Sequence, residues 1–252
     1  MKNIISLLVL ICSVAVIIVS CAKKSDTSST STDTSASDSS TTDNTTIGTG
    51  TGTTASGTVT GDDNLTGIFN SSYWGQEPSG GCIDNSTAVA TFVSSSSIPS
   101  DTLAFKKQMI FTSSTTFTES LQYYSDASCA TITGYFNLLY ANLSVGDSLS
   151  GLSAGSNPAK PTTAKKVSYT HPSMNLKSNT PSTTTWFLST LPGISLTTGN
   201  ELVIPLPTPT SIVNIAETGA MPGSSKTYLF IGSSATSTYP TDWTNASVYW
   251  QE

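Results

Sequence analysis

Residues 103–124 have the sequence LAFKKQMIFTSSTTFTESLQYY, and this stretch decides the expected fold. Every second residue of 103–111 is apolar except Lys107, and every second residue of 117–123 is apolar except Glu119. Ser113-Ser114-Thr115 separates the two runs. Residues two apart lie on the same face of a strand, so the pattern predicts a β-hairpin with one mostly apolar face.

Short apolar runs separated by turn-forming residues continue through the sequence on both sides of this hairpin. Val, Ile, Thr and aromatic residues, which suit a half-buried pleated surface, dominate them. Predicted strands lie at 67–74, 88–93, 166–169, 174–177, 186–188, 201–206, 211–216, 227–232 and 247–250. Helix is expected to be minor. The sequence therefore predicts an all-β domain, an antiparallel barrel with a β-sandwich as the alternative.

The segment 132–145, ITGYFNLLYANLSV, fits either a strand or a helix. Phe136, Leu139, Tyr140 and Leu143 would also line one face of a helix. We expect a strand, because Gly134 and two asparagines interrupt the segment and its neighbours are strands.

The N-terminus has the layout of an export signal. Lys2 precedes 16 mostly apolar residues at 4–19, fewer than the roughly 20 needed for the alternative, an uncleaved membrane anchor. Ile18-Val19-Ser20-Cys21 then resembles the lipobox of bacterial lipoproteins. The resemblance implies cleavage before Cys21, a diacylglyceryl group on its thiol and a further acyl chain such as palmitate. It also implies a place in the cell envelope. Ala22 favours the outer membrane by the sorting rule of enteric bacteria.

Residues 22–60 contain 23 Ser or Thr among 39 and almost nothing to bury. Such a segment cannot offset the entropy of ordering itself, so we expect a disordered tether, with a glycosylated stalk as the alternative. The expected organisation is a signal peptide at 1–20, a lipidated tether at 21–64 and the barrel domain at 65–252.

Three short pieces resemble small bacterial lipoproteins with a lipocalin-like barrel. They are Tyr123-Tyr124-Ser125-Asp126-Ala127-Ser128-Cys129, the segment 166–170, KVSYT, and the segment 227–232, TYLFIG, which is followed by Tyr239-Pro240-Thr241. The resemblance covers about residues 65–252 and implies a lipocalin-like barrel. The Gly-x-Trp pattern that opens true lipocalins is absent, because Ile68 and Phe69 follow Gly67.

The acidic composition of the chain excludes nucleic acids as partners. The chain has a net charge of -6, a pI near 4.6 and no arginine, so it lacks the basic surface that nucleic acids require. Membrane attachment is accordingly expected through the lipid alone.

Cys82 and Cys129 are the even pair that remains after Cys12 in the signal and Cys21 are set aside. In an exported domain such a pair favours a disulfide, with two buried thiols as the alternative. The first and third strands of an antiparallel meander run the same way, which would place both cysteines on one rim.

Candidate chemistry is sparse. Gly151-Leu152-Ser153-Ala154-Gly155 matches the nucleophile-elbow pattern, but loop residues follow where a helix is needed, and His171, the only histidine, has no acid between it and Ser153. His171 precedes Pro172 and is expected at a strand end, exposed or at an edge. One histidine cannot form a zinc site. We expect no cofactor.

Lys107 and Glu119 are the charged residues of interest, because both fall on the apolar face of the hairpin. We expect an ion pair across it, either structural or in contact with a ligand. The sequence thus favours a non-enzymatic envelope lipoprotein that binds a small apolar ligand or a macromolecular partner. The alternatives are a serine hydrolase using Ser153 and His171, and a purely structural envelope protein.

Overall fold

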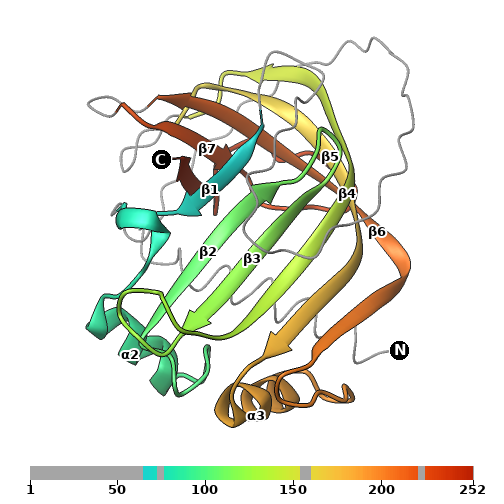
Figure 1. Cartoon of the computed structure of the whole chain (residues 1–252). Coiled ribbons are helices and arrows are strands. Elements are labelled where there is room, and N and C mark those ends of the chain that lie inside the picture. Colours follow the sequence, from blue (N-terminus) through green and yellow to red (C-terminus); the bar gives the residue numbers. More distant parts are fainter. Residues whose placement is uncertain (1–64, 73–76, 154–159, 221–224, 252) are drawn as a thin grey trace.

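The computed structural model describes residues 65–72, 77–153, 160–220 and 225–251. Within these ranges eight antiparallel strands form a closed barrel, in which each strand pairs with the next and β8 pairs with β1 (Figure 1). The strands are β1 (Gly67–Ser71), β2 (Ala104–Phe111), β3 (Phe117–Tyr124), β4 (Ile132–Ser150), β5 (Thr163–Ser178), β6 (Glu201–Ala220), β7 (Thr227–Ile231) and β8 (Ser247–Gln251). The predicted all-β barrel is confirmed, and the alternative β-sandwich is excluded. The expected signal, Cys21 and tether lie outside the described residues.

The hairpin β2–β3 has the predicted strands and register. Phe111 pairs with Phe117 next to the turn, and Ala104 pairs with Tyr124 at the far end. The amides of Thr112 and Ser113 both donate to the carbonyl of Thr116, which closes the turn. The alternating apolar residues of both strands point into the barrel, where they join the buried core.

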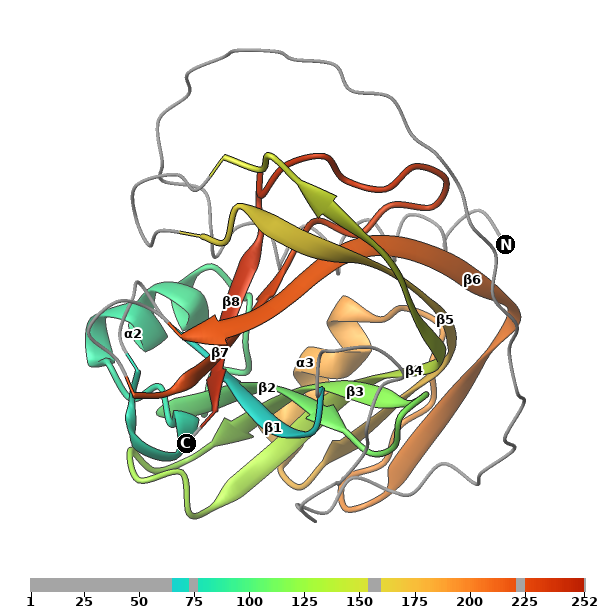
Figure 2. The ribbon, with the colours of Figure 1, turned by 90° about the horizontal axis from the view of Figure 1, so that it is seen from above.

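Strand length divides the barrel into two ends. β4, β5 and β6 have 19, 16 and 20 residues, whereas β1, β7 and β8 have five each. The short strands pair with β2 only at 108–111 and with β6 only at 216–220. We call this part of the barrel the strand-closed end. Figure 2 shows the long strands extending beyond it.

The opposite end is formed by 104–107 of β2, 121–124 of β3, 132–138 of β4, 174–178 of β5 and 201–206 of β6. No described strand continues the sheet from β6 at 201–206, and Phe105 of β2 has only an isolated bridge to Ile83. Helices α2 (Ser86–Ser94) and α3 (Pro181–Thr190) lie at this end, which we call the helix-capped end (Figure 1). A short 3₁₀ helix, η1 (Ser79–Gly81), leads from β1 toward α2.

The two helices correct the prediction of strands at 88–93 and 186–188. Each helix has a capping residue that satisfies its first amides: the Asn85 side chain accepts from Thr87 and Ala88, and the Thr180 hydroxyl accepts from Thr183. Pro181 at the first helical position further favours this start. These caps outweigh the β propensity of the Val and Phe residues that follow.

Three other predictions are refined. The ambiguous segment 132–145 is strand, as expected. β5 runs without a break through the two predicted strands 166–169 and 174–177, and β6 does the same for 201–206 and 211–216. A register shift between His171 and Ser173 absorbs Pro172 and lets both strands continue.

Three prolines stand at alternate positions of β6, namely 205, 207 and 209. Proline has no amide N–H, so this stretch of backbone lacks donors at those positions. On the side away from β5, no described strand pairs with it before Val213, which bridges to Ala235.

Three hydrophobic clusters hold the fold together. One fills the strand-closed end, with Phe117 stacked on Tyr140 and Phe111 at ring distances of 4.6 and 5.4 Å. A second joins the helices to the helix-capped end through Phe105, Tyr123 and Phe187. Gly134 gives α3 its room there, because a Cβ would lie 2.7 Å from Thr183 and 2.6 Å from the Lys177 carbonyl. The third lies on the outside, where Trp243 covers β6, β7 and β8.

Candidate functional site

Lys107 and Glu119 form the expected ion pair inside the barrel. Their Nζ and Oε1 atoms are 2.9 Å apart. Tyr249 of β8 completes the group: its hydroxyl donates to the same Oε1 at 3.4 Å, and Lys107 Nζ lies 5.7 Å from its ring centroid. No sequence pattern singled out Tyr249, because only closure of the barrel brings β8 opposite β2 and β3.

Burial and neighbouring charges shift the pKa values of two members of the polar group. Burial alone would lower the pKa of Lys107, but attraction to Glu119 and Tyr249 outweighs it and raises the pKa above the ordinary value. The pKa of Tyr249 is also raised, mainly because the side chain is buried. At neutral pH Lys107 is therefore a cation and Tyr249 is an uncharged donor. The two side chains of the ion pair are 11% and 23% exposed, Lys107 being the less accessible.

An apolar wall surrounds this group on the inner face. In the sheet register, Glu119 pairs with Leu138, Leu138 with Met174, and Met174 with Ile204. In the next row, Leu121 pairs with Phe136. Paired residues share a face, so all of these side chains point inward. Leu121, Phe136, Leu138 and Ile204, which we call the inner wall, are nevertheless only partly buried.

The partial exposure of the inner wall follows from the strand lengths. At the strand-closed end β1, β7 and β8 face β3 and β4 across the barrel, and the core residues there are buried. At the helix-capped end the described parts of those three strands do not reach, so no described strand lies opposite β3, β4 and β6 there. Leu121, Phe136 and Ile204 pack against the cluster that joins the helices to this end. Together with Leu138 they keep some apolar surface exposed next to the polar group.

A small cavity lies elsewhere, between β4, β5 and β6 at the strand-closed end. Its volume is about 10 Å³, and Leu65, Val145 and Val167 are among its lining residues. This volume holds about one water molecule. It is too small for a ligand.

His171 corrects a second prediction. It is not at an exposed strand end but is 2% exposed within β5, with its ring 5.0 Å from that of Tyr140. Its Nε2 atom is buried and has no hydrogen-bond partner among the described residues. Burial lowers the pKa of His171, although a backbone hydrogen bond at Ser173 and the charge of Glu119 act in the opposite direction.

Ser153 and His171 are not brought together. Ser153 is exposed just beyond Leu152, whose amide donates to the Thr162 carbonyl. His171 is nine residues further along from Thr162, which corresponds to roughly 30 Å of strand. The two side chains cannot share a proton at that separation.

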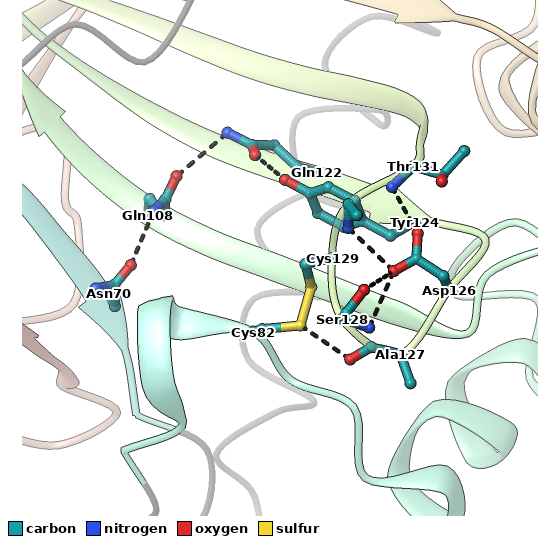
Figure 3. Close-up of a disulfide and its surroundings, with 11 residues drawn as sticks. Asn70, Cys82, Gln108, Gln122, Tyr124, Asp126, Ala127, Ser128, Cys129 and Thr131 are labelled. Atoms are coloured by element: carbon teal, nitrogen blue, oxygen red, sulfur yellow. Dashed lines mark hydrogen bonds between the residues drawn. A yellow bond between two sulfur atoms is a disulfide. The ribbon is translucent and has the colours of Figure 1, made fainter.

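The disulfide forms as predicted. Cys82 and Cys129 are bonded with a Cα separation of 5.9 Å, and β1 and β3 run the same way. Asp126 organises the loop that carries Cys129: its carboxylate accepts from the amides of Ser128, Ala130 and Thr131 (Figure 3). The Ser128 hydroxyl also donates to this carboxylate, and its hydrogen bond has the largest effect on the pKa. Together with the amide hydrogen bonds it holds the pKa of Asp126 far below its usual range. The cross-link thus lies at the helix-capped end.

The outer face of the hairpin is polar, in contrast to the inner face. Gln108 donates to Asn70, Gln122 donates to Gln108, and the Tyr124 hydroxyl donates to Gln122 (Figure 3). These hydrogen bonds link the polar side chains of the outer face to one another. We therefore place the candidate site on the inside of the barrel.

Comparisons with known proteins give no relative from which to transfer a function. No known family matches the chain, and no curated protein matches it. Among the described residues, no three His, Cys, Asp or Glu side chains are grouped as metal ligands would be, and no helix is long and apolar enough to cross a membrane.

Proposed function

We propose that the protein is a lipid-anchored envelope protein whose barrel binds a small apolar molecule without converting it. One observation carries the binding proposal: the inner wall leaves apolar side chains partly exposed within the barrel. Burying such surface gains about 25 cal/mol per Å². A ligand lying along Leu121, Phe136, Leu138 and Ile204 would be bound by this gain.

The lipid anchor is proposed from the sequence. Ile18-Val19-Ser20-Cys21 is the lipobox-like motif, and the tail that follows has no other affinity for a membrane. More than one acyl chain is needed for stable attachment, and the lipoprotein modification would supply them at Cys21. The proposed location is the cell envelope, at the outer membrane.

Binding can be tested with the mature chain and N-phenyl-1-naphthylamine, an apolar dye that fluoresces when it leaves water. We expect saturable binding to the wild type. Leu138→Asn places a polar amide on the inner wall and should weaken dye binding at least tenfold. Val203→Asn is the matched control, because Val203 is 58% exposed on the other face of β6.

The outcomes separate the alternatives. Equal dye binding by the Leu138→Asn and Val203→Asn variants would rule out the inner wall and would favour a partner at the outer surface. Absence of dye binding by the wild type would contradict the small-ligand proposal. Attachment is tested separately: Cys21→Ala should move the protein from the membrane to the soluble fraction, and retention in the detergent phase would refute the anchor.

A further inference from the structure

The polar group inside the barrel contains a hydrogen-bond acceptor, Glu119 Oε2, that no described residue uses. Lys107 and Tyr249 both donate to Glu119 Oε1. Within the part of the chain that the structure describes, Oε2 of the same carboxylate makes no hydrogen bond, and it is not fully buried. The Glu119 side chain is 23% exposed, about twice the fraction of Lys107. The accessible polar atom at this place is therefore an acceptor.

Its surroundings are the inner wall. Leu138 is directly opposite Glu119 on β4, and Leu121 is two residues along β3 on the same face. Both are partly exposed. A molecule that lies on these apolar side chains would bring one end to Oε2.

The charges of Glu119 and Lys107 limit which chemical groups can form that end of the ligand. A carboxylate or phosphate head would meet the like charge of Glu119 before it could reach Lys107, which is the more deeply buried partner. A cationic head would meet Lys107, which already neutralises the carboxylate. An uncharged O–H or N–H group can donate to Oε2 and leaves the existing pair intact.

We infer that the ligand has an apolar body and an uncharged hydrogen-bond donor at one end, which Glu119 Oε2 accepts. Fatty alcohols, monoglyceride-like molecules and N-acyl amides have this chemistry, whereas ionised fatty acids do not. The inference rests on the proposed binding function and specifies the class of ligand.

Three probes of equal chain length test the inference: 1-dodecanol as a donor, methyl dodecanoate as an uncharged acceptor and dodecanoate as an anion. Each is titrated at pH 7.5 against the mature protein loaded with N-phenyl-1-naphthylamine. We expect the alcohol to displace the dye at a concentration at least tenfold below that of the ester. The anion should be the weakest of the three.

Glu119→Gln provides the matched change. If the amide oxygen keeps the donors Lys107 and Tyr249, the amide nitrogen replaces Oε2 and turns the acceptor into a donor. The ratio of ester to alcohol concentrations should then fall from at least ten to about one. Asp147→Asn, an exposed carboxylate change on β4, should leave the ratio unchanged.

A second variant covers the case in which Glu119→Gln does not fold. Lys107→Met with Glu119→Leu removes both charges, so it should bind the dye and discriminate among the probes no more than twofold. Equal displacement by all three probes in the wild type, or an unchanged ratio in Glu119→Gln, would overturn the inference and leave the binding proposal standing. Failure of the wild type to bind the dye would instead remove the binding proposal itself.

Discussion

The two ends of the barrel share strands β2 to β6 but are closed in different ways. The strand-closed end is completed by the backbone pairing of β1, β7 and β8 and is filled by stacked aromatic rings. The helix-capped end relies on α2, α3 and the disulfide. Where the strands pair all the way around the barrel, the inward side chains are covered on all sides. At the other end the helices cover them from one side only. We therefore expect stability to be concentrated at one end and accessible apolar surface at the other.

The largest expected effect comes from truncating one side chain at each end of the barrel. Phe117 is 3% exposed and contacts Phe111, Tyr140 and Tyr169, so Phe117→Ala should cost roughly 3–5 kcal/mol of unfolding free energy. Leu138→Ala, on the partly exposed inner wall, should cost only about 1 kcal/mol. Urea denaturation of both variants measures the difference. Similar losses would mean that the two ends are equally well packed.

Removal of the disulfide should loosen the helix-capped end. Cys82→Ser with Cys129→Ser is expected to lower stability by roughly 2–4 kcal/mol, because the bond closes a loop with a sequence separation of 47. Hydrogen exchange should become faster in α2 and at Phe105, which forms the isolated bridge with Ile83. Protection at Phe69 and Met109, in the strand-closed end, serves as the internal control. Uniformly faster exchange would contradict a division between the two ends.

The ion pair lies between the two ends and should behave as a unit. Lys107→Met leaves the partly buried Glu119 without its cation and should cost roughly 2 kcal/mol. Adding Glu119→Leu should recover most of that loss, because an apolar pair of similar size replaces two charges. A double-mutant cycle by denaturation gives the coupling energy. A double variant as unstable as the sum of its parts would show that the charges act independently.

The smallest expected effect is a pH dependence from His171. Burial lowers its pKa in the folded protein, so as the pH falls below about 6.5 the unfolded chain binds a proton that the folded chain does not. Stability should therefore fall below that pH, by at most about 1.4 kcal/mol per pH unit for one group, until the lowered folded pKa is reached. His171→Gln should remove this part of the slope between pH 7 and 5. An identical slope in the variant would exclude His171 as its source.

The hairpin and the disulfide could be predicted because their determinants are local or follow from strand direction. The alternation around Lys107 and Glu119 was enough to pair them, and β1 and β3 had to run the same way in a meander. The helices were mistaken for strands although Asn85 and the Thr180-Pro181 pair are recognisable starts, because the residues after them favour strands. Tyr249 and the inner wall were beyond sequence reasoning. The place of Tyr249 depends on closure of the barrel, and the exposure of the inner wall depends on where β1, β7 and β8 end.

The prolines of β6 affect how the protein behaves among copies of itself. An unpaired strand edge can template the addition of a strand from a neighbouring chain, the first step of fibril growth. With the lipid anchor proposed above, molecules would meet at high local concentration on the membrane surface, which favours such contacts. With prolines at 205, 207 and 209, the edge offers a neighbour too few amide donors to extend the ladder. The exposed edge is therefore compatible with a crowded surface on which each barrel remains a separate particle.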